Sequence, residues 1–378
     1  MSVMASLFQG LGKSNNMRNK TMNEKKDIAS FTLGELEQEL ASLGEKKFRS
    51  RQVYDWIHKK HITDFEQMSN LSKDLREKLN KEYALYMPKI LKVLESKLDG
   101  TRKYLFELYD GNIIESVLMR YKHGNSVCVS SQAGCRMGCK FCASTLNGLE
   151  RNLYPSEILG QIYVISADIN ERISNVVVMG SGEPLDNFDN IVRFITLLTD
   201  ENGLNISQRN LTISTCGLVD KIYKMADMGF NFTLAISLHS PTDELRKSIM
   251  PVANAYSIDE IIKACEYYYH KNNRRITFEY TIIKDFNDSK ECAYILSDLM
   301  NRLKKSGVIT HINLISVNPV KETNFQKTDT GFIMKFKNIL ETNKNNVTIR
   351  REMGSDINAA CGQLRKSYID AGTKRKVQ

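Results

Sequence analysis

From about residue 126 onward, short apolar stretches alternate with longer amphipathic ones, and this alternation restricts the fold more than any other feature of the sequence. The short stretches are rich in β-branched residues, which favours strands, while the longer ones carry apolar residues at helical spacing. We predict strands at residues 126–130, 175–179, 211–215, 233–238, 276–282 and 311–316, and helices at residues 155–168, 188–198, 258–270 and 291–304.

Regular alternation of strands and helices produces a parallel sheet with right-handed crossovers. Six such units are too few for a closed eight-stranded barrel, so we expect an α/β fold built on an open, partial (β/α)6 barrel. In barrels of this kind the chemistry takes place at the carboxyl ends of the strands.

The remainder of the chain indicates additional units. Before residue 86 the pattern is helical, with Thr32 and Glu35 placed as a capping box and leucines at helical spacing up to Gly44. Residues 102–120 include alternation that is typical of strands. We predict a poorly ordered extension at residues 1–21, a helical accessory domain at 22–85, a β-rich connector at 86–124, the barrel at 125–345 and a C-terminal segment at 346–378.

The helical accessory domain mixes basic and aromatic residues between positions 46 and 60. Basic side chains contact phosphates and aromatic rings stack on bases, so this stretch is compatible with an RNA-binding face. The other interpretation is a solvated helix surface whose aromatic residues pack in the core. The residues concerned are Lys46, Lys47, Arg49, Arg51, Lys59 and Lys60, with Phe48, Tyr54 and Trp56 among them.

The charge balance favours a polyanionic partner, but only weakly. Lysine and arginine number 53 against 44 aspartates and glutamates, a net charge of +9. No stretch approaches the ~18 consecutive apolar residues of a membrane span. The first residues also lack the basic start and apolar run of an export signal. We therefore expect a cytoplasmic protein without membrane contact.

Three of the eight cysteines, Cys135, Cys139 and Cys142, form a C-x3-C-x2-C loop after the first predicted barrel strand. Three thiolates in one loop can hold three irons of a 4Fe–4S cluster and leave the fourth iron open to a substrate. Zinc is the alternative, with Cys128 as a fourth ligand. Phe141 before the last cysteine, and the position of Cys128 within a strand, favour the iron–sulfur interpretation.

This loop resembles the signature of the radical S-adenosylmethionine superfamily, in which an aromatic residue precedes the last cysteine. The resemblance implies that the open iron chelates S-adenosylmethionine, which one electron cleaves to a 5′-deoxyadenosyl radical. A second superfamily element follows the next predicted strand, where Gly180, Gly182 and Glu183 precede Pro184. Glycines allow close backbone approach, and Glu183 can accept hydrogen bonds from the methionine ammonium.

Three further stretches are similar to the bacterial dual-specificity RNA (adenine-C2) methyltransferases. They are residues 128–135, residues 236–241 and residues 356–364, and the similarity extends from about Phe31 to Leu364. The resemblance implies formation of 2-methyladenosine in 23S ribosomal RNA, at the peptidyl-transferase centre, and in transfer RNA next to the anticodon. It also implies an electron donor such as flavodoxin or ferredoxin, and we expect a monomer.

In that family the methyl group first passes to a cysteine, because carbon 2 of adenine is no nucleophile for direct methyl transfer. By resemblance, Cys361 is the methyl carrier, and a second S-adenosylmethionine supplies the radical that removes hydrogen from the methylated sulfur. The carbon radical adds to the base and links RNA to Cys361. Cys128 then attacks that sulfur and releases the product with a disulfide, while Glu115 accepts the proton. An exposed strand glutamate is the other interpretation of Glu115.

The family also implies a set of cofactor contacts. Gly182 and Glu183 would hold the methionine portion, while Ser214, Ser237, Leu238 and His239 would line the middle of the site and Asn318 its far end. His239 is otherwise a capped histidine at a strand end. Cys265 and Cys292 lie in helical patterns and are expected to pack in the core, and Cys216 follows a strand beside the cofactor.

Two alternatives remain at this stage. A related adenine-C8 methyltransferase, which confers ribosomal antibiotic resistance, shares the cluster cysteines and both reactive cysteines. Pro184 and the residues before Ile357 favour the C2 enzyme. A protein of a different class would be a non-catalytic RNA-binding protein with a structural iron–sulfur or zinc centre.

Overall fold

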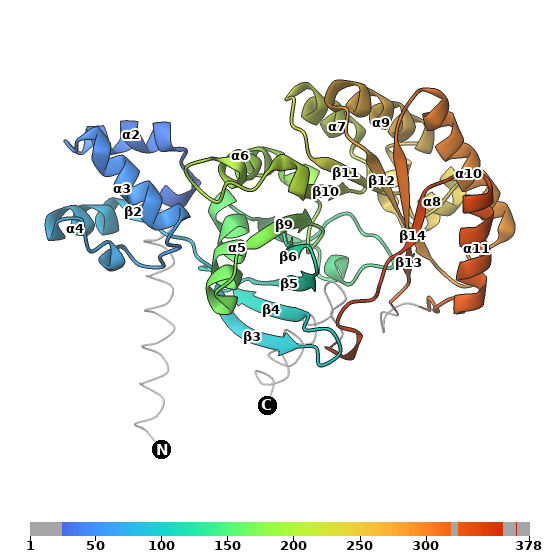
Figure 1. Cartoon of the computed structure of the whole chain (residues 1–378), viewed down its shortest axis with the longest axis horizontal. Coiled ribbons are helices and arrows are strands. Elements are labelled where there is room, and N and C mark those ends of the chain that lie inside the picture. Colours follow the sequence, from blue (N-terminus) through green and yellow to red (C-terminus); the bar gives the residue numbers. More distant parts are fainter. Residues whose placement is uncertain (1–24, 319–323, 358–367, 369–378) are drawn as a thin grey trace, which may run out of the picture.

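The computed structural model describes residues 25–318, 324–357 and 368, and its largest element is a ten-stranded sheet (Figure 1). The strand order is β14-β13-β12-β11-β10-β9-β6-β5-β4-β3. Strands β6 and β9 to β14 run parallel, whereas β3, β4 and β5 join β6 as antiparallel neighbours. The strands are β3 (Lys89–Glu95), β4 (Arg102–Glu107), β5 (Ile113–Tyr121), β6 (Gly124–Val129), β9 (Ile173–Val178), β10 (Leu211–Thr215), β11 (Thr233–Ser237), β12 (Ile276–Ile282), β13 (Thr310–Ser316) and β14 (Val347–Ile349).

The predicted fold class, an α/β partial barrel, is confirmed. All six predicted strands are present as β6 and β9 to β13, and the four predicted helices are present as α5, α6, α9 and α10. Three helices and the short strand β14 were not predicted. The helices are α5 (Pro155–Ile169), α6 (Phe188–Thr199), α7 (Val219–Asp227), α8 (Asp243–Ile249), α9 (Ile258–Asn272), α10 (Lys290–Lys305) and α11 (Thr330–Thr342).

The parallel strands form the core because both of their faces are covered. All seven residues of β12 are buried, and the apolar side chains of β9 to β13 pack against the helices in one continuous cluster. Figure 1 shows these helices along the outside of the curved sheet. Helix α9 begins with a capping box in which Ser257 and Glu260 satisfy each other's backbone amides. Cys265 and Cys292 are buried in this core, as predicted.

The connector continues the sheet of the barrel. Strand β5 pairs with β6 from Val117 opposite Cys128 to Tyr121 opposite Gly124, and β4 and β3 follow in antiparallel order. A separate two-stranded sheet, β7 (Gln132–Gly134) with β8 (Leu149–Asn152), closes the base of the cysteine loop. The cysteine loop is therefore anchored at both ends by backbone hydrogen bonds.

The N-terminal unit contains three helices, α2 (Leu33–Ser42), α3 (Lys47–His58) and α4 (Lys73–Glu82), and one parallel strand pair, β1 (Lys26–Asp27) with β2 (Tyr83–Ala84). The predicted capping box is present, since the Thr32 side chain accepts from the amide of Glu35 and the Glu35 carboxylate accepts from the amide of Thr32. The unit has a hydrophobic core of its own.

Three polar contacts attach the N-terminal unit to the barrel. The Tyr54 hydroxyl donates to Asp200 at 2.7 Å, and Arg193 makes two bonds of 2.7 Å with the carboxylate of Glu35. The ring of His58 is buried and lies 2.7 Å from the Tyr163 hydroxyl. Tyr54 is fully buried, so the inclusion of Tyr54 in a possible RNA-binding face was wrong. Tyr54 stands among basic residues in the sequence because successive residues of a helix lie on different faces, and the face that carries Tyr54 packs against the barrel.

A further contact at this junction predicts a pH-dependent stability. The Asp27 carboxylate accepts from the hydroxyls of Ser30 and Ser156, and burial raises the pKa of Asp27 to about 6. Because the folded chain binds this proton more tightly than the unfolded chain, Asp27 costs stability progressively as pH rises from about 4 to about 6. Asp27→Asn keeps the shape but does not ionise. In urea denaturation, the unfolding free energy of the wild type minus that of Asp27→Asn should decrease between about pH 4 and about pH 6 and stay constant at higher pH. A difference that does not change between pH 4.5 and 7.5 would contradict the assignment.

Candidate active site

A cavity of about 270 Å³ lies at the carboxyl ends of β9 to β13, where the fold predicts chemistry. One wall is the cysteine loop, and the other walls come from the residues that end successive strands. Three predicted groups meet here. They are the cluster cysteines, Cys135, Cys139 and Cys142; the glycine turn, Gly182 and Glu183; and the strand-end residues Ser214, Ser237, His239 and Asn318.

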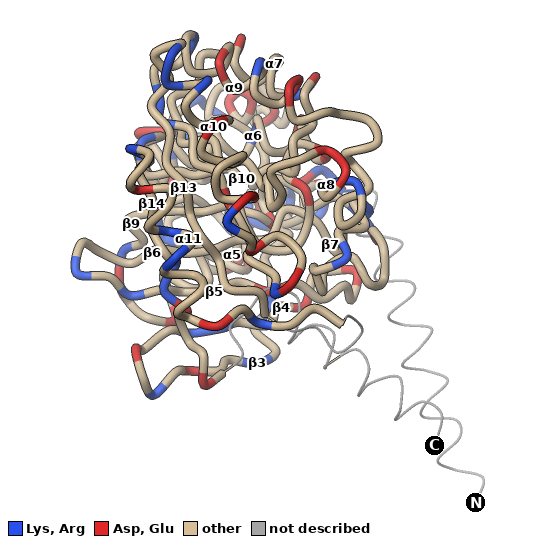
Figure 2. Tube along the Cα trace, turned by 90° about the vertical axis from the view of Figure 1, so that its right-hand side faces the viewer, with Lys and Arg blue, Asp and Glu red and all other residues tan. Residues whose placement is uncertain are grey.

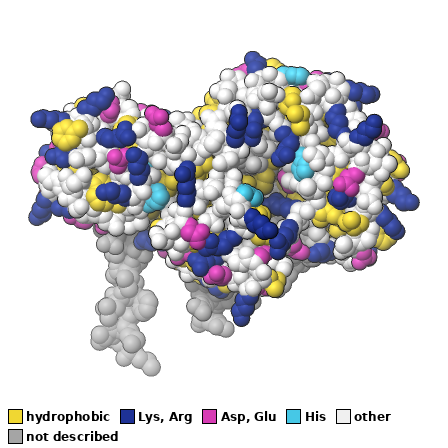
Figure 3. All heavy atoms as spheres, in the orientation of Figure 1, with side chains coloured by type: hydrophobic (Ala, Val, Ile, Leu, Met, Phe, Trp, Pro, Cys, Tyr) yellow, Lys and Arg dark blue, Asp and Glu magenta, His cyan; other side chains and the backbone are white. Residues whose placement is uncertain are grey.

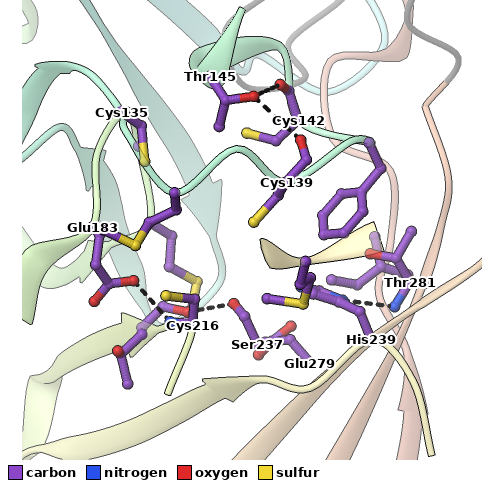
Figure 4. Close-up of a pocket in the computed structure, with 18 of the residues that line it drawn as sticks. Cys135, Cys139, Cys142, Thr145, Glu183, Cys216, Ser237, His239, Glu279 and Thr281 are labelled. Carbon is purple, nitrogen blue, oxygen red and sulfur yellow. Dashed lines mark hydrogen bonds between the residues drawn. The ribbon is translucent and has the colours of Figure 1, made fainter. Parts of the chain in front are cut away.

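Figure 4 shows the sulfur atoms of Cys135, Cys139 and Cys142 facing one space above Glu183, Ser237 and His239. The loop is held in shape by its backbone: the amide of Cys142 donates to the carbonyl of Cys139 at 3.0 Å, and the amide of Cys135 donates to the carbonyl of Gly148 at 2.9 Å. A fixed loop of this kind presents three ligands without a large ordering cost on binding.

The thiols require a positively charged partner in order to ionise. Burial raises the pKa of all three, to about 12 for Cys135. Iron ions would supply that charge, because a thiolate is the form that ligates a metal. In residues 25–318 and 324–357, no three His, Cys, Asp or Glu side chains gather closely enough to hold one metal ion. A single zinc would need sulfurs about 3.8 Å apart, whereas in a 4Fe–4S cluster each thiolate binds a different iron. The donor set fits the cluster.

The zinc interpretation also requires Cys128 as a fourth ligand, and Cys128 is not placed for that role. Cys128 is the penultimate residue of β6, paired with Val117 and Val177, and does not line the cavity that the other three cysteines share. A four-cysteine site would need all four sulfurs around one centre.

The glycine turn after β9 brings backbone close to the cavity. Gly182 has a φ of +107°, and a side chain there would place Cβ 2.6 Å from Cβ of Gln132. Gln132 in turn accepts from the amide of Glu183 at 2.8 Å through its side-chain oxygen. Ser181, between the glycines, is fully buried, and its hydroxyl lies 3.2 Å from that of Ser144. Only glycine is compatible with this conformation and this spacing.

Replacement of Gly182 is therefore expected to damage cofactor binding. Gly182→Ala combines left-handed backbone strain with a clash against Gln132, which would displace Glu183, and should cost about 1–3 kcal/mol of stability. We expect at least a tenfold weaker affinity for S-adenosylmethionine in anaerobic equilibrium dialysis. Gly229→Ala is the matched control, because Gly229 has a φ of +69° but open space around it. Equal affinity in the two variants would argue against a role for the turn in binding.

The carboxylate of Glu183 is buried at the start of the turn after Gly182. One oxygen accepts from the amide of Leu185 at 3.1 Å and the other from the amide of Cys216 at 2.7 Å. Burial raises the pKa of Glu183, and these hydrogen bonds oppose the shift by stabilising the charged form. A carboxylate has lone pairs left after two such bonds, so Glu183 is able to accept from an ammonium group as well.

The strand-end residues are held in fixed positions. The hydroxyls of Ser214 and Ser237 lie 3.2 Å apart on neighbouring strands. Nδ1 of His239 accepts from the amide of Thr281 at 3.0 Å, and burial lowers the pKa of His239 to about 3. The imidazole is therefore neutral, with its proton on Nε2. Leu238 differs from the others, because its side chain is buried in the core and does not line the cavity.

Strand register places the two other predicted residues on the same face of the sheet as this site. Cys128 pairs with Val177, which pairs with Thr212, so Cys128 faces the same side as Ser214, two residues along. Glu115 lies on this face too, since it precedes Val117, the partner of Cys128, by two residues. Glu115 is 3% exposed and forms an ion pair of 3.2 Å with Lys103, so the interpretation as an exposed strand glutamate was wrong. Cys361 lies outside the described residues.

The cavity wall includes residues that were not predicted, among them Glu279, Thr281 and Arg350. Glu279 pairs in register with Ser237 and is 3% exposed, with one oxygen accepting from Asn313 at 2.9 Å. A glutamate in the middle of a strand that otherwise contains only β-branched and aromatic residues was the available signal. Arg350 follows β14, a strand of three residues that is too short to recognise from its pattern.

The open barrel, the three-cysteine loop and the glycine turn together define a radical S-adenosylmethionine enzyme. The sequence profile of the radical SAM superfamily matches residues 129–295. The profile of the ribosomal RNA large subunit methyltransferase N-terminal domain matches residues 26–85. A radical SAM methyltransferase from Sphaerobacter thermophilus has a similar structure, with a TM-score of 0.84 and 38% identity over 89% of this chain and 98% of that one.

Curated relatives narrow the family further. The chain is 56% identical to a probable dual-specificity RNA methyltransferase RlmN of Lachnoclostridium phytofermentans, over 93% of this chain and 97% of the relative. It is 57% identical to the protein of the same name from Lachnospira eligens, over 91% and 97%. The chain belongs to the RlmN family of dual-specificity RNA methyltransferases. It is a radical S-adenosylmethionine RNA methyltransferase, and its cofactors are a 4Fe–4S cluster and S-adenosylmethionine, which is both methyl donor and radical source.

Proposed function

We propose that this enzyme forms 2-methyladenosine in 23S ribosomal RNA and in transfer RNA next to the anticodon. One observation carries the proposal: a single cavity is lined by Cys135, Cys139, Cys142 and Glu183. The chain that contains this cavity is 56% identical to a dual-specificity relative over 93% of its length. A loop with three thiolates supplies one ligand fewer than a cluster has irons, which leaves one iron for the cofactor.

Cys135, Cys139 and Cys142 hold the cluster, and Gly182 and Glu183 hold the methionine end of the cofactor. When bound, these groups supply an electron and a 5′-deoxyadenosyl radical beside the strand ends. Ser214 and Ser237 offer hydroxyls to the middle of the cofactor, and Asn318 offers an amide to its far end. His239 is neutral and so adds a hydrogen-bond donor without adding charge. Leu238 fixes the end of β11, because its side chain is in the core and its amide donates to the carbonyl of Glu279 at 3.1 Å.

The chain's other reactive groups complete the transfer. Cys361 accepts the methyl group as a thioether and later carries the carbon that bonds to the base. Cys128 attacks the sulfur of Cys361 and breaks its bond to the methylene carbon, so that a disulfide forms and this carbon takes up a proton to become the methyl group of the released RNA. The one excess electron of the radical adduct would return to the oxidised cluster. Glu115 takes the proton from carbon 2, and the Lys103 ammonium lies 3.2 Å from its carboxylate and holds it in place. The common face of Cys128, Glu115 and Ser214 supports this assignment.

The surface supports an RNA substrate. Figure 3 shows Lys and Arg side chains around a hollow near the middle of one face, with apolar side chains inside it. In the N-terminal unit, Lys60 lies 3.4 Å from the ring centre of Trp56, and Phe48 is 52% exposed beside Arg49. The Phe48 ring is exposed and the Trp56 ring is half-buried, and rings next to cations are suited to bases and phosphates. Figure 2 shows that charges of both signs are dispersed over the rest of the trace, so the net charge is not confined to one run.

We propose a one-electron protein donor such as flavodoxin or ferredoxin, a monomeric enzyme and a cytoplasmic location. A one-electron donor matches the single electron that cofactor cleavage requires. No helix in the described parts of the chain is long and apolar enough to cross a bilayer.

Mass spectrometry of RNA tests the regiochemistry. The protein would be expressed in a bacterial host from which the endogenous adenine-C2 methyltransferase gene has been deleted. We expect 2-methyladenosine to reappear in both ribosomal and transfer RNA. Formation of 8-methyladenosine without 2-methyladenosine would refute the proposal in favour of the C8 enzyme, and neither product would refute both.

A further inference from the structure

The largest fully buried side chain in the described structure is that of Arg246, on α8. A buried guanidinium usually has a carboxylate partner, because transferring an unpaired charge out of water is costly. Among residues 25–318 and 324–357, no carboxylate lies within 4.0 Å of Arg246 to form an ion pair. The position of this charge therefore requires another explanation.

The hydrogen bonds of Arg246 account for only part of its polar groups. Nη2 donates to the carbonyl of Cys216 at 2.5 Å, and Nε donates to the carbonyl of Leu238 at 3.3 Å. Nη1 is buried without a partner in the described residues. These carbonyls follow β10 and β11, so the guanidinium lies just behind the strand ends that form the cavity wall. Arg246 itself does not line the cavity.

The cysteine loop packs against the same helix. The amide of Lys140, within the loop, donates to the carbonyl of Ile249 at the end of α8 at 2.9 Å. Cys139 and Cys216 belong to one small apolar cluster with Ile249 and Met250. Burial and the nearby Glu183 carboxylate raise the pKa of the Cys139 and Cys216 thiols, whereas the positive charge of Arg246 lowers the pKa of both. In a dry environment of this kind a fixed charge acts with little screening.

We propose that Arg246 is a fixed, buried cation that offsets the negative charge of the thiolate-bound cluster and so stabilises its one-electron reduced form. This inference rests on the proposed ligation of the cluster by Cys135, Cys139 and Cys142. Three thiolates and an added electron increase the negative charge in a buried site, and a nearby positive charge lowers the free energy of the reduced state more than that of the oxidised state. The electron comes from an external one-electron reductant, and no bond of Arg246 forms or breaks.

The test is a potentiometric measurement on the anaerobically reconstituted full chain, with the reduced cluster followed by electron paramagnetic resonance. Arg246→Met removes the charge at similar length, and Arg246→Lys retains it. At the wild-type midpoint potential, we expect the ratio of reduced to oxidised cluster to be about tenfold lower in the methionine variant than in the wild type. This corresponds to a midpoint potential about 59 mV more negative for a one-electron couple. The lysine variant should recover most of this ratio. Lys247→Met is the matched control, since Lys247 is exposed on the same helix and its charge is screened by water.

Iron and sulfide content would be measured on each preparation. An unchanged midpoint in an Arg246→Met protein with full iron content would overturn the inference. A failure of Arg246→Met and Arg246→Gln to retain iron, with a wild-type midpoint in Arg246→Lys, would assign Arg246 a structural role and would overturn it too. Failure of the wild-type chain to bind a cluster at all would instead refute the proposed function, so the two failures are distinguishable.

Discussion

Replacement of Cys361 by alanine is expected to abolish RNA methylation while leaving cofactor cleavage intact. In the proposed reaction no other group of the chain can carry the methyl carbon, and adenine carbon 2 is not nucleophilic enough to take it directly. We expect the yield of 2-methyladenosine to fall by at least about 10³-fold, as for other residues that carry a covalent intermediate. The cavity and its cluster ligands are formed by other residues, so 5′-deoxyadenosine should still appear.

Both products would be measured in one anaerobic reaction with an RNA fragment as substrate, by liquid chromatography and mass spectrometry. Cys265→Ala is the matched control, because Cys265 is a fully buried thiol on α9 without contact with the cavity. That variant should methylate RNA at close to the wild-type rate. A Cys361→Ala protein that still forms 2-methyladenosine would remove Cys361 from the reaction and, with it, the thioether intermediate.

Replacement of Cys128 by alanine is expected to trap RNA on the protein. The first half of the reaction does not use Cys128, so the methylated Cys361 can still bond to the base. Release requires attack by the Cys128 thiolate on that sulfur, and alanine has no nucleophile to offer. Burial raises the pKa of Cys128, whereas Arg350 and Lys103 lower it, so two cations support formation of the attacking thiolate.

The trapped species would be detected as an RNA-linked band on a denaturing gel, followed by mass spectrometry of the nuclease-digested protein. Cys361→Ala combined with Cys128→Ala should show no such band, because the carbon bridge never forms. Free 2-methyladenosine at wild-type yield from the single Cys128→Ala variant would contradict the disulfide step.

Much of the fold was predictable because its strands are buried on both faces. A strand such as β12, with all seven residues buried, consists of β-branched and aromatic residues apart from one glutamate, and this composition is visible in the sequence. Strand β14, with three residues, and helix α8, with seven, are too short to show a period. The position of β14 depends on its pairing with β13, and the position of α8 depends on its contact with the cysteine loop.

The three cysteines proposed as cluster ligands could be identified for a different reason, because their local spacing in the sequence is itself the signal. Glu279, Arg350 and Arg246 are far apart in the chain, and only the sheet register and the packing of α8 bring them to one region. Tyr54 shows the converse, since its place among basic residues indicated a surface while the helix turns it toward Asp200. Single-residue burial of this kind is set by tertiary structure.

The central claim is that Cys135, Cys139 and Cys142 hold a cluster with one open iron that binds the cofactor. The most direct test is a count of iron and acid-labile sulfide in the anaerobically prepared wild type and in Cys139→Ala, with 5′-deoxyadenosine measured after reduction in the presence of S-adenosylmethionine. We predict about four irons and four sulfides per wild-type chain together with 5′-deoxyadenosine, and neither in the variant. One zinc per chain, or full iron without any 5′-deoxyadenosine, would contradict the claim.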